Sequence, residues 1–375
     1  MKDFPLFRSP RAAVTGTLLT ALPLLLLSSS ALGGLYVVMI VLFLLPAALC
    51  ITAAVCGLLP MGLGLAAGLV AMGRLFGRQG LILAGLYMLP VLAVFLLAVA
   101  LRIPFKRACP ALIGVHAAVL AGCYLLLQAW TGGSLYTAAG ERAAQLMRTW
   151  EMGDSMLYQL YTTGLIGLPE TLEGTALVPV LGGYTLSDAA REDLLLSLST
   201  MVTRSLALLI PNMIVTQSIL GGVACLLLPL RLGYIAQERR AFLAAPQEES
   251  GGGEGPAPVD FPDLGMPRFE TWHLPRGIGW QVGLALAAGY LLRGSANPPL
   301  AVAGILLYSA GHAVFSIQGA ALVYFMQKLR GTKRVWRVIV ISALFLFSVL
   351  VFIGIFDQMN NIRGLRKPRE PKEGL

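Results

Sequence analysis

Long uninterrupted apolar runs dominate this chain. A helix of roughly 20 apolar residues crosses about 30 Å of hydrocarbon, and the runs of that length cover residues 12–32, 35–57, 80–101, 109–131, 205–229, 300–327 and 336–356. Two shorter runs, residues 60–73 and 279–292, are ambiguous by length. The pattern predicts an all-α fold: a polytopic bundle of transmembrane helices with about eight spans.

Composition supports this assignment. The chain is 57% hydrophobic and only 13% charged, with a mean hydropathy of +0.75, which leaves too little polar surface to coat a soluble globule of 375 residues. The net charge of +9 does not indicate nucleic acid, because ten of the basic residues lie from Lys328 onward, beside predicted spans. Topology and anionic lipid explain them better.

The first apolar run leaves two alternatives. It follows Lys2, Arg8 and Arg11 and ends in small residues, as a cleavable signal peptide would. Further apolar runs follow at once, which favours an uncleaved first span.

The distribution of Lys and Arg predicts the orientation in the cell membrane. The N-terminus and residues 102–107 and 328–337 are basic and are expected to be cytoplasmic, whereas residues 131–195 carry three Arg against eight Asp or Glu and are expected outside. If every run crosses, the basic C-terminal tail falls outside. We therefore expect one short run to be re-entrant, with both termini inside.

These patterns divide the chain into six regions. They are N-terminal transmembrane helices (1–131), an exterior amphipathic region (132–195), a transmembrane helix (196–230), a cytoplasmic linker ending in a proline and aromatic collar (231–276), C-terminal transmembrane helices (277–357) and a basic tail (358–375).

The exterior region has helical signals of its own. Leu146, Trp150, Leu157 and Tyr161 recur at near-helical spacing and predict an amphipathic helix packed on the bundle or the membrane surface, with a substrate gate as the alternative. The segment 185–188 fits a capping box at the start of the next span.

No catalytic constellation is recognisable. The sequence has no HExxH or GxSxG motif, only three histidines, and five cysteines whose spacing fits no metal motif. His273, in the collar, has no partner at catalytic spacing. We expect neither an enzyme nor a bound metal or cofactor.

Polar residues inside spans are the candidate ligand-binding groups, because burying them in lipid is costly. His312 shares a helix face with Tyr308 and Phe315, which could hold a flat ligand or serve close helix packing beside Gly304, Gly311 and Gly319. The full set of candidates is Tyr308, His312, Phe315, Gln318, Arg204 and Asn212. Arg204 could instead extend to the exterior surface, and Asn212 could satisfy the backbone at the Pro211 kink.

Asp357 and Arg363 stand six residues apart at the end of the last span. We expect them to pair and end that helix, the alternative for Asp357 being a proton relay.

Several C-terminal segments carry a family resemblance. "PNMIVTQSILGGVACLLLPLRLGY" (211–234), "FETWHLP" (269–275), "GAALVYFMQKLRG" (319–331) and "GIFDQMNNIRGLRK" (354–367) resemble the YybS-like family of uncharacterised bacterial membrane proteins. The departure lies at residues 358–361, where the family pattern has an aromatic run. The family is distantly similar to the substrate-binding components of energy-coupling-factor transporters, and the resemblance therefore implies a small-molecule binder that couples to separate ATPase subunits.

Two functions from different classes follow. The first is this transporter component, which needs partner ATPases because the sequence contains no GxxxxGK[ST] loop. The second is a non-transporting envelope scaffold, associated with morphogenesis or sporulation, that contacts other membrane proteins through Gly-rich helix faces. Both place the protein in the lipid bilayer.

Overall fold

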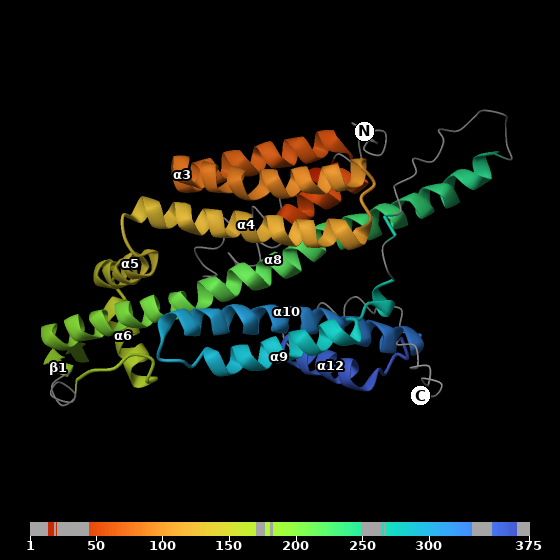
Figure 1. The fold of residues 1–375 in the computed structure, drawn as a ribbon. Coiled ribbons are helices and arrows are strands. Elements are labelled where there is room, and N and C mark those ends of the chain that lie inside the picture. Colours follow the sequence, from red (N-terminus) through yellow and green to blue (C-terminus); the bar gives the residue numbers. More distant parts are fainter. Residues whose placement is uncertain are drawn as a thin grey trace, which may run out of the picture. The chain divides into compact units, whose positions relative to one another are not determined.

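The structure is a computed structural model that describes residues 14–18, 20, 45–169, 177–180, 183–248, 264–265, 268–331 and 347–365. The predicted runs 12–32, 35–57 and 336–356 lie partly outside these residues. The described elements are α3 (Leu58–Ala100), α4 (Phe105–Thr131), α5 (Leu135–Thr149), α6 (Gly153–Thr162), β1 (Leu177–Val180), β2 (Gly183–Leu186), α8 (Asp188–Glu248), η1 (Phe269–Thr271), α9 (Arg276–Leu292), α10 (Pro298–Leu329) and α12 (Phe347–Asn360) (Figure 1). The predicted all-α class is confirmed, with one small antiparallel hairpin, β1–β2.

Several helices have the length and apolarity of membrane spans. Within the described residues, four qualify: Phe76–Ala100, Phe105–Thr131, Asp188–Ala236 and Pro299–Leu329. Shorter apolar helices cover Leu45–Val55, Leu58–Arg74 and Ser348–Asn360. The chain is therefore an integral membrane protein.

The ambiguous run 60–73 forms a helix of its own. α3 is broken at Gly77, whose φ of 64° and ψ of −159° lie outside the helical region and are accessible to glycine. The chain reverses there, so that the two arms of α3 lie side by side (Figure 1) and Gly85 of the second arm approaches Leu69 of the first.

The chain forms two compact units, which we describe separately. Unit 2 comprises residues 122–213, and unit 1 comprises residues 1–121 and 214–375. α8 begins in unit 2, where the Ser187 hydroxyl accepts a hydrogen bond from the Ala190 backbone amide. The cap lies within the segment predicted to form a capping box, but at Ser187 and not at the first residue of that box. The helix continues to Glu248, whereas the sequence predicted an end at residue 230. The prediction fell short because hydropathy marks only the apolar stretch of a helix and does not show where its hydrogen bonding ends.

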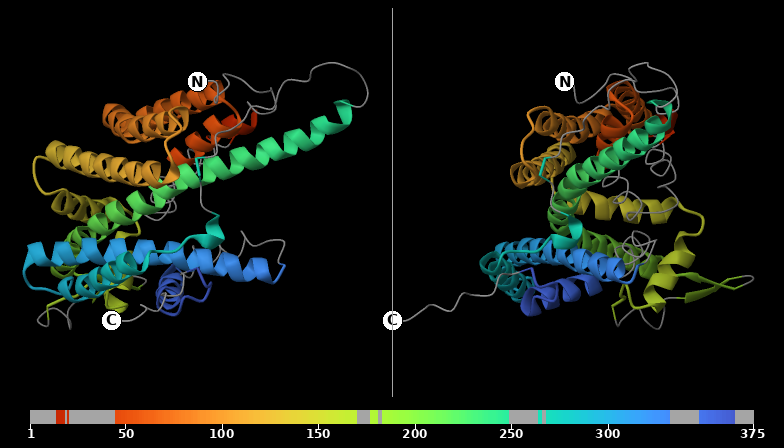
Figure 2. Two further views of the ribbon diagram at one scale, coloured as in Figure 1. Left: turned by 45° about the vertical axis from the view of Figure 1, so that its right-hand side comes forward. Right: turned by 90° about the vertical axis from the view of Figure 1, so that its right-hand side faces the viewer.

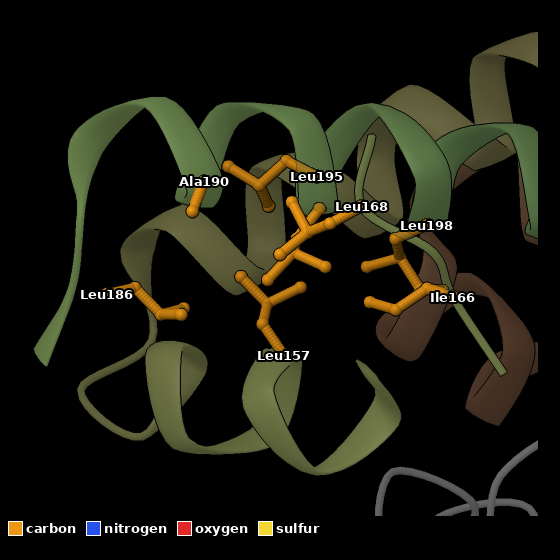
Figure 3. Close-up of a cluster of buried hydrophobic side chains, with 8 residues drawn as sticks. Leu157, Ile166, Leu168, Leu186, Ala190, Leu195 and Leu198 are labelled. Atoms are coloured by element: carbon orange, nitrogen blue, oxygen red, sulfur yellow. The ribbon is translucent and has the colours of Figure 1, made fainter. Parts of the chain in front are cut away.

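Unit 2 contains two helices where the periodicity predicted one. α5 ends at Thr149 and α6 starts at Gly153, where a Cβ would overlap the Met147 carbonyl. Leu157 is fully buried against α8, whereas Trp150, at the reversal, is half exposed. The core of the unit joins α6, the chain after it, β2 and α8 (Figure 3). Its members are Leu157, Ile166, Leu168, Leu186, Ala190, Leu194, Leu195 and Leu198.

In unit 1, glycines bring the C-terminal helices close together. α9 lies along α10 (Figure 2), and a Cβ at Gly304 would overlap the Arg293 amide. Gly319 of α10 and Gly354 of α12 face each other so closely that a Cβ on either would overlap a carbonyl of the other helix. Such contacts allow dense packing in lipid, where the hydrophobic effect does not drive helices together.

Candidate functional site

A buried ion pair lies at the end of α12 in unit 1. Arg363 and Asp357 side chains are 1% and 3% exposed, and Arg363 Nη2 lies 2.6 Å from Asp357 Oδ2. The predicted pairing is therefore present. The guanidinium also donates to the carbonyls of Glu270 and Trp272, each at 2.8 Å. Arg363 thus ties the segment around η1 to the end of the last described helix.

Gln318 of α10 extends this polar cluster. Its amide nitrogen donates to Asp357 Oδ2 at 3.1 Å and to Gln358 Oε1 at 3.0 Å. Its oxygen accepts from the Leu274 amide at 3.4 Å. Gln318 is 4% exposed, and its bonds give the Asp357 carboxylate and the backbone at Leu274 partners away from water.

The chain reversal that returns Arg363 to Asp357 depends on Asn361. Its φ of 48° is the left-handed conformation in which helices commonly end, and its amide donates to the Asp357 carbonyl at 2.9 Å. Gln358 packs on α9 where Gly279 has no side chain. Both residues fall in the stretch that departs from the family pattern, and both have defined contacts here.

A second ion pair holds η1 to the end of α10. Lys328 Nζ lies 2.6 Å from Glu270 Oε1. Burial raises the pKa of Glu270, but the Lys328 hydrogen bond, a backbone hydrogen bond and the charges of Lys328 and Arg231 outweigh it, so the net pKa is lowered.

An apolar cavity of about 180 Å³ adjoins the polar cluster in unit 1. Ile113 of α4, Val223 of α8 and Val314 of α10 line its apolar sides, while His273 and Gln318 supply the polar groups. The remaining lining residues are Cys109, Ile219, Trp272, Leu274 and Ile317. An engineered apolar cavity of about 150 Å³ accepts benzene, so this cavity has room for a molecule of about one ring.

The predicted aromatic face of α10 is occupied by the protein itself. The rings of Tyr308 and His312 are 5.4 Å apart, and Phe315 is 1% exposed. The Arg293 guanidinium lies over Tyr308 at 4.6 Å and over Tyr290 at 4.3 Å, a cation–π arrangement. This geometry matches the helix-packing alternative for the face more closely than an open ligand slot.

The two candidates on α8 belong to unit 2. Arg204 is exposed and lines a groove of about 610 Å³ together with Asp193, Ser197 and Thr200. Asn212 is also exposed, two helical turns further along α8. Of the predicted residues, Gln318 alone lines the cavity of unit 1.

Sequence reasoning did not identify Trp272 and Leu274 as cavity residues, and it placed them only in the proline and aromatic collar that ends the cytoplasmic linker. The segments that resemble the YybS-like family could have indicated this cluster in advance. Four residues lie in or beside those segments and meet in one cluster in the structure: Glu270, Gln318, Asp357 and Arg363. Comparison with protein-family models, with curated proteins and with solved structures finds no match to this chain.

Proposed function

We propose that this protein is the small-molecule-binding component of a membrane transport system energised by separate ATPase subunits, as its resemblance to the YybS-like family implies. The observation that carries the proposal is the cavity beside the polar cluster. Apolar walls with a few convergent polar groups are typical of ligand sites. The proposed orientation keeps the N-terminus in the cytoplasm and residues 132–195 outside.

The lining of the cavity defines the ligand class. Both amide hydrogens of Gln318 are committed to Asp357 and Gln358, whereas its oxygen, which has two lone pairs, accepts one hydrogen bond in the structure. The ligand is therefore compact and largely apolar, with one hydroxyl or amine that donates to Gln318.

The glycine contacts favour this function over the envelope scaffold. The scaffold was predicted to use Gly-rich faces to bind other membrane proteins. Gly304 and Gly311 of α10 instead contact α9 of the same chain, and Gly279 of α9 and Gly319 of α10 contact α12. Their faces serve internal packing.

Purification in mild detergent, with mass spectrometry of bound small molecules and co-eluting proteins, tests the proposal. Val314→Phe fills the cavity, and Leu306→Phe is the matched control on an exposed face of α10. We expect a metabolite enriched with the wild type and Leu306→Phe but lost with Val314→Phe, together with ATPase subunits in all three preparations. Envelope-assembly proteins without an enriched metabolite would support the scaffold instead.

A further inference from the structure

A polar stripe on α8 lines the groove of unit 2. Asp193, Ser197, Thr200 and Arg204 follow one another at intervals of four, three and four residues, a spacing that places them on one face of a helix. The stripe begins with an acid and ends with a base, and two hydroxyl groups stand between them. The groove therefore has a negative end, a positive end and hydrogen-bonding groups along its length.

The two charges at the ends of the stripe are available to a ligand. Within the described part of the chain, neither Asp193 nor Arg204 forms an ion pair or a side-chain hydrogen bond. By contrast, their neighbours Arg191 and Glu192 are both paired with other residues of the unit. Two unpaired charges of opposite sign, held apart on one helix face, are complementary to a ligand with one charge at each end.

The separation of these charges sets the length of the ligand. Arg204 follows Asp193 by 11 positions, which corresponds to about 16 Å along the helix axis. Both side chains lean toward the start of the helix, so their charges stay far apart. A single amino acid or a zwitterionic lipid headgroup carries its two charges only a few bonds apart and cannot reach both. An extended peptide of about five residues can, because each residue spans roughly 3.3–3.6 Å.

The opposite wall of the groove is the segment 165–169, which follows α6. The Gly167 amide donates to Ser197 Oγ at 3.1 Å and ties this segment to α8. Leu168 points into the core of unit 2 (Figure 3), whereas Leu165 is 59% exposed. The volume between the two walls, about 610 Å³, falls in the range of small-ligand sites.

We propose that this groove binds short peptides with free termini, the ammonium group at Asp193 and the carboxylate at Arg204. The Thr200 hydroxyl donates to the Leu196 carbonyl at 2.9 Å, so its oxygen can accept from a peptide N–H group. The exposed side chains of Leu165 and Leu196 contact those of the peptide. The described lining of this groove and that of the unit 1 cavity have no residue in common. Peptide binding is therefore a second ligand site, which does not depend on the proposed function.

Equilibrium dialysis of the full-length protein in lipid nanodiscs against unlabelled peptides tests the site. The peptides alternate leucine and alanine, have free termini and differ in length, and mass spectrometry measures the retention of each above that of empty nanodiscs. We expect retention to peak near about five residues and to be absent for the dipeptide. Val314→Phe, which fills the cavity of unit 1, should retain peptides as the wild type does. Equal retention at every length, or retention at none, would overturn the proposal.

Matched changes in the peptide and the protein then assign each end. Acetylation of the peptide N-terminus should weaken binding to the wild type by up to about fivefold, the contribution of an exposed ion pair, and should not affect Asp193→Asn. Amidation of the C-terminus should weaken binding similarly and should not affect Arg204→Gln. Glu141→Gln and Arg142→Gln, which remove exposed charges of α5 outside the groove, should keep the preference for free termini. An Asp193→Asn protein that still rejects the acetylated peptide would refute the assignment.

Discussion

At the residue scale, the pair of Asp357 and Arg363 is the most consequential contact. Neither side chain can regain solvent, since both are almost completely buried. Removing one partner of such a pair leaves a charge in a medium that cannot stabilise it. The surrounding backbone carbonyls and Gln318 form hydrogen bonds with the paired groups. They would not neutralise a single charge left behind.

We predict that Asp357→Asn lowers the free energy of unfolding by about 3–5 kcal/mol. Thermal or denaturant unfolding in detergent measures it. The control is Glu192→Gln, which breaks the exposed ion pair with Arg148 and should cost less than about 1 kcal/mol. Similar losses for the two variants would contradict the buried role.

Glu270 gives a pH prediction. Its pKa is lowered below the usual 4.5, so its stabilising contribution is complete above that value and is lost as the pH falls through the folded-state pKa. We expect the melting temperature of the wild type to fall more steeply below about pH 5 than that of Glu270→Gln. Glu141→Gln, at an exposed position on α5, should behave as the wild type; parallel curves for all three would disprove the contribution of Glu270.

At the scale of elements, the C-terminal helices depend on the absence of side chains where they cross. Gly319 and Gly354 stand on facing surfaces of α10 and α12, each against backbone of the other helix. Backbone cannot move aside as a flexible side chain can.

We therefore predict opposite effects for two Gly→Ala changes. Gly319→Ala should lower the melting temperature markedly, whereas Gly114→Ala, in open space on α4, should be neutral or stabilising because Ala favours a helix by about 1 kcal/mol. Differential scanning fluorimetry compares them. A tolerated Gly319→Ala would show that α10 and α12 are further apart than described.

Some of these elements could be predicted from sequence and others could not. Hydropathy predicted the apolar run 80–101, which lies in the second arm of α3. A helix that crosses lipid needs a continuous apolar stretch, and hydropathy detects such a stretch directly. It could not locate the contact of His116 with Cys225, since these residues lie 109 positions apart on different helices. Arg363 and Glu270 are 93 positions apart in the sequence, so their contact could not be predicted. Only the pairing of Arg363 with Asp357, six residues away, could be predicted from the sequence.

At the scale of the whole molecule, the distribution of charge predicts which segments face the cell exterior. The region 131–195 is acidic, and basic residues cluster near Arg107 and Lys328. Most of unit 2 lies in the acidic region.

Cysteine labelling in intact cells tests this orientation. In a cysteine-free background, Glu151→Cys should react with a membrane-impermeant maleimide, whereas Arg107→Cys should react only after permeabilisation. Both native positions are exposed, so access depends on the side of the membrane. Reversed labelling would invert the topology.

The anchoring of the Glu270 and Trp272 carbonyls by Arg363 also sets an order of events during synthesis. Translation adds Arg363 only after the residues of α9, α10 and α12 have been synthesised. Until then, the segment from Glu270 to Trp272 lacks these donors, and a chain that terminates before residue 363 never acquires them. The position of the segment from Glu270 to Trp272 therefore becomes fixed only when synthesis has passed the last described helix.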